Sequence, residues 1–200
     1  PAFVLRNEVK KLINKKPMVQ KNGVLTLDKI QKIEFSHVYF RYPGKENYVL
    51  EDCSFTMEAG QQIGLVGENG CGKSTIVKLI LRLYDVEEGE ILLNGIDIME
   101  YDIEKYRAMF SVLFQDFIKY SFTLRENVSL SDIEKSDNDE RIKDALSKSE
   151  MSELVSTWDK GLETPLTRSF EPDGKELSGG QWQRIALSRV FFADRAFVFF

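Results

Sequence analysis

The feature that most constrains this chain is a glycine-rich turn followed at once by lysine and serine. The pattern G-x-x-x-x-G-K-[ST] is fulfilled by Gly67, Glu68, Asn69, Gly70, Cys71, Gly72, Lys73 and Ser74. The glycines let the backbone curl so closely that successive N–H groups point at one anion. Lys73 adds a positive charge for the outer phosphates of a nucleotide, and Ser74 adds a hydroxyl for Mg²⁺. These residues predict a site for ATP and Mg²⁺. Thr75, which directly follows Ser74, is predicted to belong to the same site.

The residues on either side supply the strand and the helix that such a loop requires. Residues 61–66 are a short run that ends at the loop, as expected of a buried parallel strand. Apolar residues then recur at spacings of three and four, which predicts a helix with Ile76, Val77, Leu79, Ile80, Leu83 and Tyr84 on one face. The N-terminus of that helix faces the loop and favours an anion. A glycine-rich turn without a ligand is the alternative, but it gives the Lys73-Ser74 pair no role.

Composition limits the class of protein and the partners. A chain of 200 residues can bury a core in one or two domains. Its formal net charge of −5 gives no general attraction for nucleic acid, which we therefore exclude as a partner. No apolar stretch approaches the roughly 20 residues that span a bilayer, and the first residues lack the basic-then-apolar pattern of a signal peptide, so we expect a soluble, cytosolic chain. Cys53 and Cys71 form neither a disulfide framework nor a set of metal ligands.

The remaining segments indicate short strands first and helices later. Residues 1–30 carry many lysines and are interrupted by proline and glycine, so we interpret them as a linker from an upstream segment. Alternation from residue 33 to residue 57 predicts strands, and an Asn-Gly turn within residues 89–98 predicts a hairpin. Further strand-like runs lie at 110–114 and 196–200, and apolar spacing predicts helices within 121–157. The acidic stretch at 132–140 is interpreted as a solvated loop. Because the chain starts at Pro1 and ends within an apolar run at Phe200, we expect it to be a piece of a longer protein.

A second motif, Leu177-Ser178-Gly179-Gly180-Gln181, precedes another apolar helix face. Ser178 and Gln181 have the spacing of a capping box, in which each side chain bonds the backbone of the other. Gly179 and Gly180 leave the helix N–H groups accessible, so this helix start can also receive an anion. A capped helix start with no ligand is an equal alternative, since the box is a common structural device.

The two motifs, in this order and at this distance, resemble the ATP-binding cassette of ABC transporters, and the resemblance runs from about residue 33 to residue 200. Leu-Ser-Gly-Gly-Gln matches the signature sequence of that family. Gln115 matches the family's Q-loop glutamine, which reaches the metal and the attacking water. Tyr42, in Phe-Arg-Tyr-Pro-Gly, matches the aromatic residue that stacks on adenine. The sequences around Gln115 and at residues 123–127 are similar to those of exporters.

The resemblance implies a fold, a mechanism and partners. The implied fold is α/β: a P-loop NTPase core around a mostly parallel sheet, an antiparallel β subdomain near the start, and a helical subdomain at about 116–176, all within a cassette at 31–200. Two cassettes would bind head to tail, with Ser178, Gly179, Gly180 and Gln181 of each facing ATP on the loop of the other. ATP-driven closure would then power export through a transmembrane domain, to which residues 164–176 would be adjacent, at the cytoplasmic face of the cell membrane. Ser74 and Gln115 would face Mg²⁺.

Two departures from the family leave other functions open. Family members place an Asp for Mg²⁺ and a Glu for the attacking water after the strand that ends near Phe200, and a switch histidine further on; neither carboxylate is in this chain. The single histidine, His37, lies in an early predicted strand, at the wrong place. Without those carboxylates hydrolysis by this chain alone would be impaired. The alternatives are a module that only binds nucleotide or a partner, and a soluble ABC ATPase that transports nothing.

Overall fold

The computed structural model describes residues 19, 23–68 and 70–200, which form two compact units divided between Arg107 and Ala108. The linker expected at residues 1–30 therefore lies largely outside the described residues, and the boundaries of the expected cassette remain predictions. The first unit contains β1 (Lys32–Phe40), β2 (Leu50–Glu58), α2 (Lys73–Ile80), β3 (Glu88–Leu93), β4 (Ile96–Asp97), η1 (Ile98–Glu100) and α3 (Ile103–Arg107). The second contains β5 (Phe110–Val112), α4 (Leu124–Ser129), η2 (Ile133–Lys135), α5 (Asp139–Lys148), α6 (Ser152–Ser156), η3 (Gly161–Glu163), α7 (Gly179–Ala193) and β6 (Phe197–Phe199).

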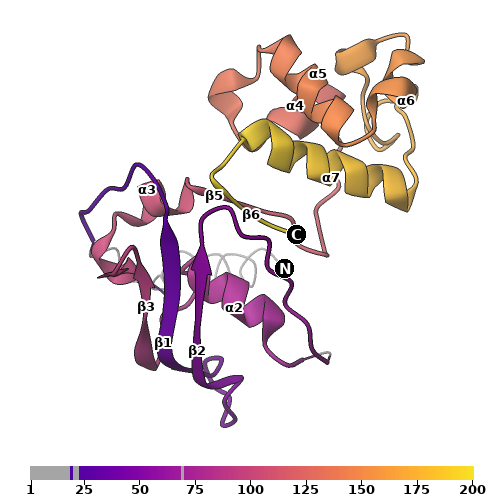
Figure 1. Ribbon diagram of the computed structural model, residues 1–200. Coiled ribbons are helices and arrows are strands. Elements are labelled where there is room, and N and C mark those ends of the chain that lie inside the picture. Colours follow the sequence, from indigo (N-terminus) through magenta and orange to yellow (C-terminus); the bar gives the residue numbers. More distant parts are fainter. Residues whose placement is uncertain (1–18, 20–22, 69) are drawn as a thin grey trace, which may run out of the picture. The chain divides into compact units, whose positions relative to one another are not determined.

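An antiparallel sheet of order β2-β1-β3-β4 is the main sheet of the first unit (Figure 1). The residues expected on one face of the first strand are its buried ones, namely Ile33, Phe35, Val38 and Phe40. The spacing of three between Phe35 and Val38 is explained by a bulge at this point, which keeps both side chains on the core face. The expected antiparallel β region is therefore confirmed.

The predicted Asn-Gly hairpin joins β3 to β4. Asn94 and Gly95 both have positive φ, 52° and 82°, as a tight hairpin turn of this kind requires. The Asn94 side chain also accepts hydrogen bonds from the backbone N–H groups of Gln31 and Lys32, at 2.8 and 2.9 Å. The turn thus fixes the start of β1 as well as the hairpin.

Helix α2 (Lys73–Ile80) ends at Ile80 and is therefore shorter than the apolar spacing predicts. Arg82 follows with φ of 53°, in the left-handed region. The Arg82 N–H bonds the Leu79 carbonyl and the Leu83 N–H bonds the Lys78 carbonyl, each at 2.9 Å, which is the Schellman arrangement. Leu83 and Tyr84 therefore lie beyond the helix rather than on its face.

The strand expected at residues 61–66 does not form. Residues 61–68 belong to neither helix nor strand, and Ile63, Leu65 and Val66 are exposed. A parallel strand buried on both faces gains its stability from paired neighbours, so a suitable sequence does not suffice. In the described part of the chain, parallel pairing between strands occurs between β5 and β6, with Phe110 opposite Phe197.

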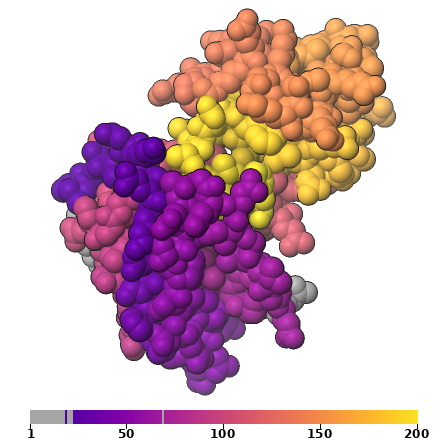
Figure 2. Space-filling model, in the orientation of Figure 1, coloured from indigo at the N-terminus to yellow at the C-terminus, as the bar shows by residue number. Residues whose placement is uncertain are grey.

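The second unit is mainly helical and has its own core. Helix α7 packs against α4 and α5, and the space-filling view shows the atoms of this unit in close contact (Figure 2). The core of this unit consists of buried apolar side chains from three helices, α4, α5 and α7, and from the segments between them: Leu124, Val128, Ile142, Ala145, Leu146, Met151, Trp158, Leu166, Trp182, Ile185 and Phe192. The helices predicted within 121–157 are confirmed as α4, α5 and α6.

Candidate nucleotide-binding site

Two glycines shape the loop that precedes α2. Gly70 and Gly72 have φ of 87° and 95°, which residues with a Cβ seldom adopt. A Cβ at Gly72 would meet Leu50 Cδ2 at 2.8 Å and the Val49 carbonyl at 3.2 Å, so the backbone here lies directly against the start of β2. Asn69 lies outside the described residues. The sequence pattern thus marks a loop whose curvature needs glycine, as predicted.

Lys73, the first residue of α2, returns its side chain to the loop. Its Nζ donates to the carbonyl oxygens of Gly67 and Glu68, each at 2.7 Å, and lies 3.6 Å from Cys71 Sγ. The Cys71 N–H bonds the Glu68 carbonyl at 3.3 Å. The ammonium group therefore stabilises the turn by hydrogen bonds to two of its carbonyl oxygens. It also places a positive charge beside the loop, where an anion could bind.

The start of α2 offers several donors to an anion. Gly72 is the N-cap, no side chain of the described residues caps it, and the first turn has no acidic residue. The first N–H groups of a helix have no partner within the helix, so they are available to phosphate oxygens. Ser74 is exposed, and Thr75 beside it is buried at 3% relative exposure. Loop, ammonium and helix start together fit a phosphate group, and the Ser74 hydroxyl fits one position of Mg²⁺.

Tyr42 lies close to α2 within the same unit. Its hydroxyl is 3.0 Å from Thr75 Oγ1, and the Lys78 Nζ donates to it at 3.4 Å. Its ring makes edge contacts with Phe40 and Tyr84, each with centroids 5.2 Å apart and planes close to perpendicular. The aromatic residue that the sequence singled out is thus fixed beside the helix that carries Lys73 and Ser74. Lys78 and Tyr84 were not expected at this site, since apolar spacing placed Tyr84 on the helix itself.

The second motif starts α7 with the capping box that its spacing predicts. The Ser178 N–H donates to Gln181 Oε1 at 2.8 Å, and the Gln181 N–H donates to Ser178 Oγ at 3.3 Å. Ser178, Gly179 and Gly180 are exposed, and a Cβ on either glycine would meet nothing within 4 Å. The helix start is open to solvent although it is capped, so both interpretations of this motif are compatible with its geometry.

Gln115 is exposed in the turn that follows β5 in the second unit. The segment after it is held by two polar residues, the buried Asn127 and the half-buried Arg189, that the sequence gave no reason to select. Asn127 Nδ2 lies 3.0 Å from the Tyr120 carbonyl, and Arg189 Nη1 donates to the Ile118 carbonyl at 2.9 Å. Arg189 Nη2 also donates to Asn127 Oδ1 at 2.8 Å, and burial lowers the pKa of the Arg189 guanidinium. A hydrogen-bond network between residues 62 positions apart leaves no mark in local spacing.

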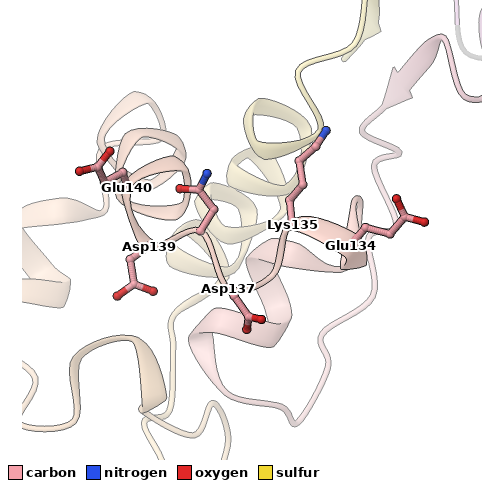
Figure 3. A pocket seen from close by; sticks show the side chains of 6 residues that line it. Glu134, Lys135, Asp137, Asp139 and Glu140 are labelled. Atoms are coloured by element: carbon pink, nitrogen blue, oxygen red, sulfur yellow. The ribbon is translucent and has the colours of Figure 1, made fainter.

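The acidic stretch at 132–140 surrounds a shallow, open depression, and its side chains point in different directions (Figure 3). Lys135 pairs with Asp132 at 2.8 Å, and Arg125 pairs with Asp139 at 2.6 Å. Hydrogen bonds from these cations lower the pKa of both carboxyl groups. Among the residues that the structure describes, no three acidic, histidine or cysteine side chains gather as they would for a metal. The stretch is largely exposed to solvent, as predicted, but it is not a plain loop, because it contains η2 and the first residues of α5.

No helix in the described ranges combines the length and the apolar content that crossing a bilayer requires.

Comparison with known proteins identifies the family. A profile described as ABC transporter matches residues 50–200. The subtilin transport ATP-binding protein SpaT of Bacillus subtilis is 36% identical over 192 residues, which cover 96% of this chain and 30% of that protein. The ATP-dependent lipid A-core flippase of Haemophilus ducreyi is 37% identical over 174 residues, which cover 86% of this chain and 29% of that protein.

Among solved structures, a bacterial Atm1-family ABC exporter with ATP bound matches with a TM-score of 0.85 and 26% identity, over 98% of this chain and 34% of that one. The expected α/β cassette fold is therefore confirmed. The chain spans 29–34% of the length of these proteins. Because the family profile covers more than half of the sequence, this chain belongs to the ABC transporter family.

Proposed function

We propose that this chain is the ATP-binding and ATP-hydrolysing cassette of an exporter. The observation that carries the proposal is the start of α2, where the glycine loop, the Lys73 ammonium and an uncapped helix N-terminus with the exposed Ser74 occur together. Each of these groups favours negative charge. The relatives named as transport ATP-binding protein, flippase and exporter support the same function.

Each site residue has a role that follows from its chemistry. We assign the phosphates to the loop and the start of α2, namely Gly67, Glu68, Asn69, Gly70, Cys71, Gly72, Lys73, Ser74 and Thr75, and the Lys73 side chain exchanges its bonds with loop carbonyls for bonds with phosphate oxygens. Tyr42 stacks on adenine. The family resemblance assigns Ser74 and Gln115 as ligands of Mg²⁺, which when bound would neutralise charge that develops on the phosphates.

The partners follow from the second motif. Ser178, Gly179, Gly180 and Gln181 form an exposed helix start, which suits the phosphates of ATP held by another cassette in a head-to-tail pair. A transmembrane domain of the same transporter is the second partner, and the cytoplasmic face of the membrane is the location. We further propose that residues 31–200 form the cassette, with residues 1–30 as the linker that precedes it.

ATP binding and steady-state hydrolysis by the purified protein test the proposal, with any native residues that follow Phe200 included. Lys73→Ala removes the ammonium from the loop and is expected to abolish turnover and weaken ATP binding. Lys143→Ala removes an exposed lysine from α5 and is the matched control, expected to behave as the unmodified protein. Binding without turnover in the unmodified protein would instead support a module that only binds nucleotide. Equal activity in the Lys73→Ala variant would refute the site.

A further inference from the structure

The contacts of Tyr42 give its hydroxyl a role apart from that of its ring. Thr75 and Lys78 are three positions apart on α2, so they lie on the same side of the helix, and both reach the Tyr42 hydroxyl. The Lys78 Nζ is 3.4 Å from this hydroxyl and 5.4 Å from the ring centroid, so the ammonium lies toward the hydroxyl end of the ring. It therefore leaves the centre of the ring uncovered.

The chemistry of lysine fixes the direction of one of these two hydrogen bonds. A lysine ammonium can only donate, so the Tyr42 oxygen accepts from Lys78. Either hydroxyl of the Tyr42–Thr75 pair, 3.0 Å apart, can be the donor, and we consider the direction from Tyr42 to Thr75. In this direction Thr75 accepts on its oxygen and keeps its own hydrogen for another acceptor. Donation by Lys78 polarises each bond further along the chain, because linked hydrogen bonds strengthen one another.

Thr75 stands where that hydrogen is useful. It lies in the first turn of α2, directly after Ser74, and it is almost fully buried. The N–H groups of this turn already favour an anion. A phosphate oxygen is an acceptor that could take the polarised Thr75 hydrogen.

We propose that Lys78, the Tyr42 hydroxyl and Thr75 form a directed hydrogen-bond relay that strengthens binding of a nucleotide's phosphates. Lys78 and the Tyr42 hydroxyl are then positioning groups that act through Thr75. This inference rests on the proposed nucleotide site, but it separates two contributions of one residue: the Tyr42 ring serves the base, and its hydroxyl serves the phosphates.

Two ligands separate these contributions: ATP, and inorganic tripolyphosphate, which has no base. Tyr42→Phe keeps the ring and removes the relay. It is therefore expected to lower the affinities for both ligands by the same factor, about threefold to tenfold, which corresponds to the loss of one hydrogen bond. Tyr42→Ala is expected to lower the affinity for tripolyphosphate by that factor and the affinity for ATP by a larger factor. Tyr48→Phe removes a hydroxyl from a ring of the same unit that packs against Tyr39, and as the matched control it should leave both affinities unchanged.

A double-mutant cycle distinguishes the relay from direct attraction between Lys78 and phosphate. Lys78→Met should weaken tripolyphosphate binding when Tyr42 is intact and have little further effect in the Tyr42→Phe variant. An equal effect of Lys78→Met in both backgrounds overturns the relay, and so does a Tyr42→Phe variant that binds tripolyphosphate as the unmodified protein does. In either case the nucleotide site stands. Failure of the unmodified protein to bind either ligand overturns the nucleotide site itself. Circular dichroism melting of each variant checks that it is folded.

Discussion

Asn127 is the buried residue whose replacement should most disturb the second unit. It is fully buried in α4. Its Nδ2 lies 3.0, 3.3 and 3.0 Å from the carbonyl oxygens of Tyr120, Phe122 and Thr123, and its Oδ1 accepts from Arg189 Nη2 at 2.8 Å. One amide thus holds the chain entering α4 and also anchors a guanidinium from α7.

The cost of Asn127→Ala follows from these contacts. The amide has two hydrogens, so the three carbonyl contacts amount to about two full hydrogen bonds, each worth about 1 kcal/mol. The bond from the charged guanidinium is worth about 1.5–3 kcal/mol. We therefore expect the free energy of unfolding to fall by about 3–5 kcal/mol, at the high end for a single substitution.

Asn127→Asp tests the direction of these bonds. Asp keeps the shape and the acceptor for Arg189, but it turns a carboxylate oxygen toward three carbonyl oxygens. At neutral pH we expect a loss at least as large as that of Asn127→Ala, despite the new opposite charge beside Arg189. Protonation restores a donor and burial favours the neutral acid, so the pKa of the new carboxyl is expected above its ordinary value of about 4 and the defect should shrink as pH falls toward it.

Urea unfolding followed by tryptophan fluorescence reports on the stability of the second unit, which contains Asn127. Both tryptophans of the chain, Trp158 and Trp182, lie in the core of that unit. Asn138→Ala is the control: Asn138 caps α5 by accepting from the Arg141 N–H at 3.0 Å, and loss of such a cap costs about 1 kcal/mol. The reasoning is refuted if Asn127→Ala costs no more than Asn138→Ala, or if Asn127→Asp is clearly the milder change at neutral pH.

Three further outcomes are expected. Tyr42→Ala should weaken ATP binding by about 1–3 kcal/mol in calorimetric titration, the range for a base stacked on an aromatic ring, and unchanged affinity would remove the stacking role. ATP should slow alkylation of Cys71, which is exposed in the loop, whereas the rate at the half-buried Cys53 should not change; mass spectrometry of each site follows both, and no protection of Cys71 would contradict the loop assignment. Hydrogen bonding to Arg125 lowers the pKa of Asp139 from 3.8, so the stability from this pair is complete above that value and is lost as pH falls through the lowered pKa. Asp139→Asn should remove this part of the acid dependence of tryptophan-detected unfolding, and an unchanged profile would show that the pair contributes nothing.

Features that depend on a few neighbouring residues could be predicted from the sequence. The hairpin at Asn94-Gly95 and the capping box at Ser178 and Gln181 formed as expected, because their hydrogen bonds join residues at most three positions apart and only certain side chains can make them. The buried face of β1 was predicted for a related reason, since alternation records which side of the strand meets the core.

Features that depend on distant partners could not be predicted in the same way. The end of α2 was missed because Arg82 adopts the left-handed conformation that a sequence usually announces with glycine. The apolar residues of 61–66 have strand-like sequence, but strand formation requires a neighbour to pair with, and that requirement is invisible in the segment itself. The network of Asn127 and Arg189 joins α4 to α7, and no local pattern precedes it.

The glycines of the loop combine both kinds of information. Gly70 and Gly72 share a positive φ, so curvature of the backbone alone would explain either one. A Cβ on Gly70 would meet nothing within 4 Å, whereas a Cβ on Gly72 would strike Leu50 and the Val49 carbonyl at the start of β2. Gly72 therefore has two tasks: it supplies the backbone curvature of the loop, and it lets α2 begin directly against the antiparallel sheet. The motif predicts the first task from eight consecutive residues, but the second depends on a strand more than twenty positions earlier. The end of the loop at Gly72 is consequently positioned by the sheet as well as by its own glycines, and with it the start of α2 that carries Lys73, Ser74 and the first helix N–H groups.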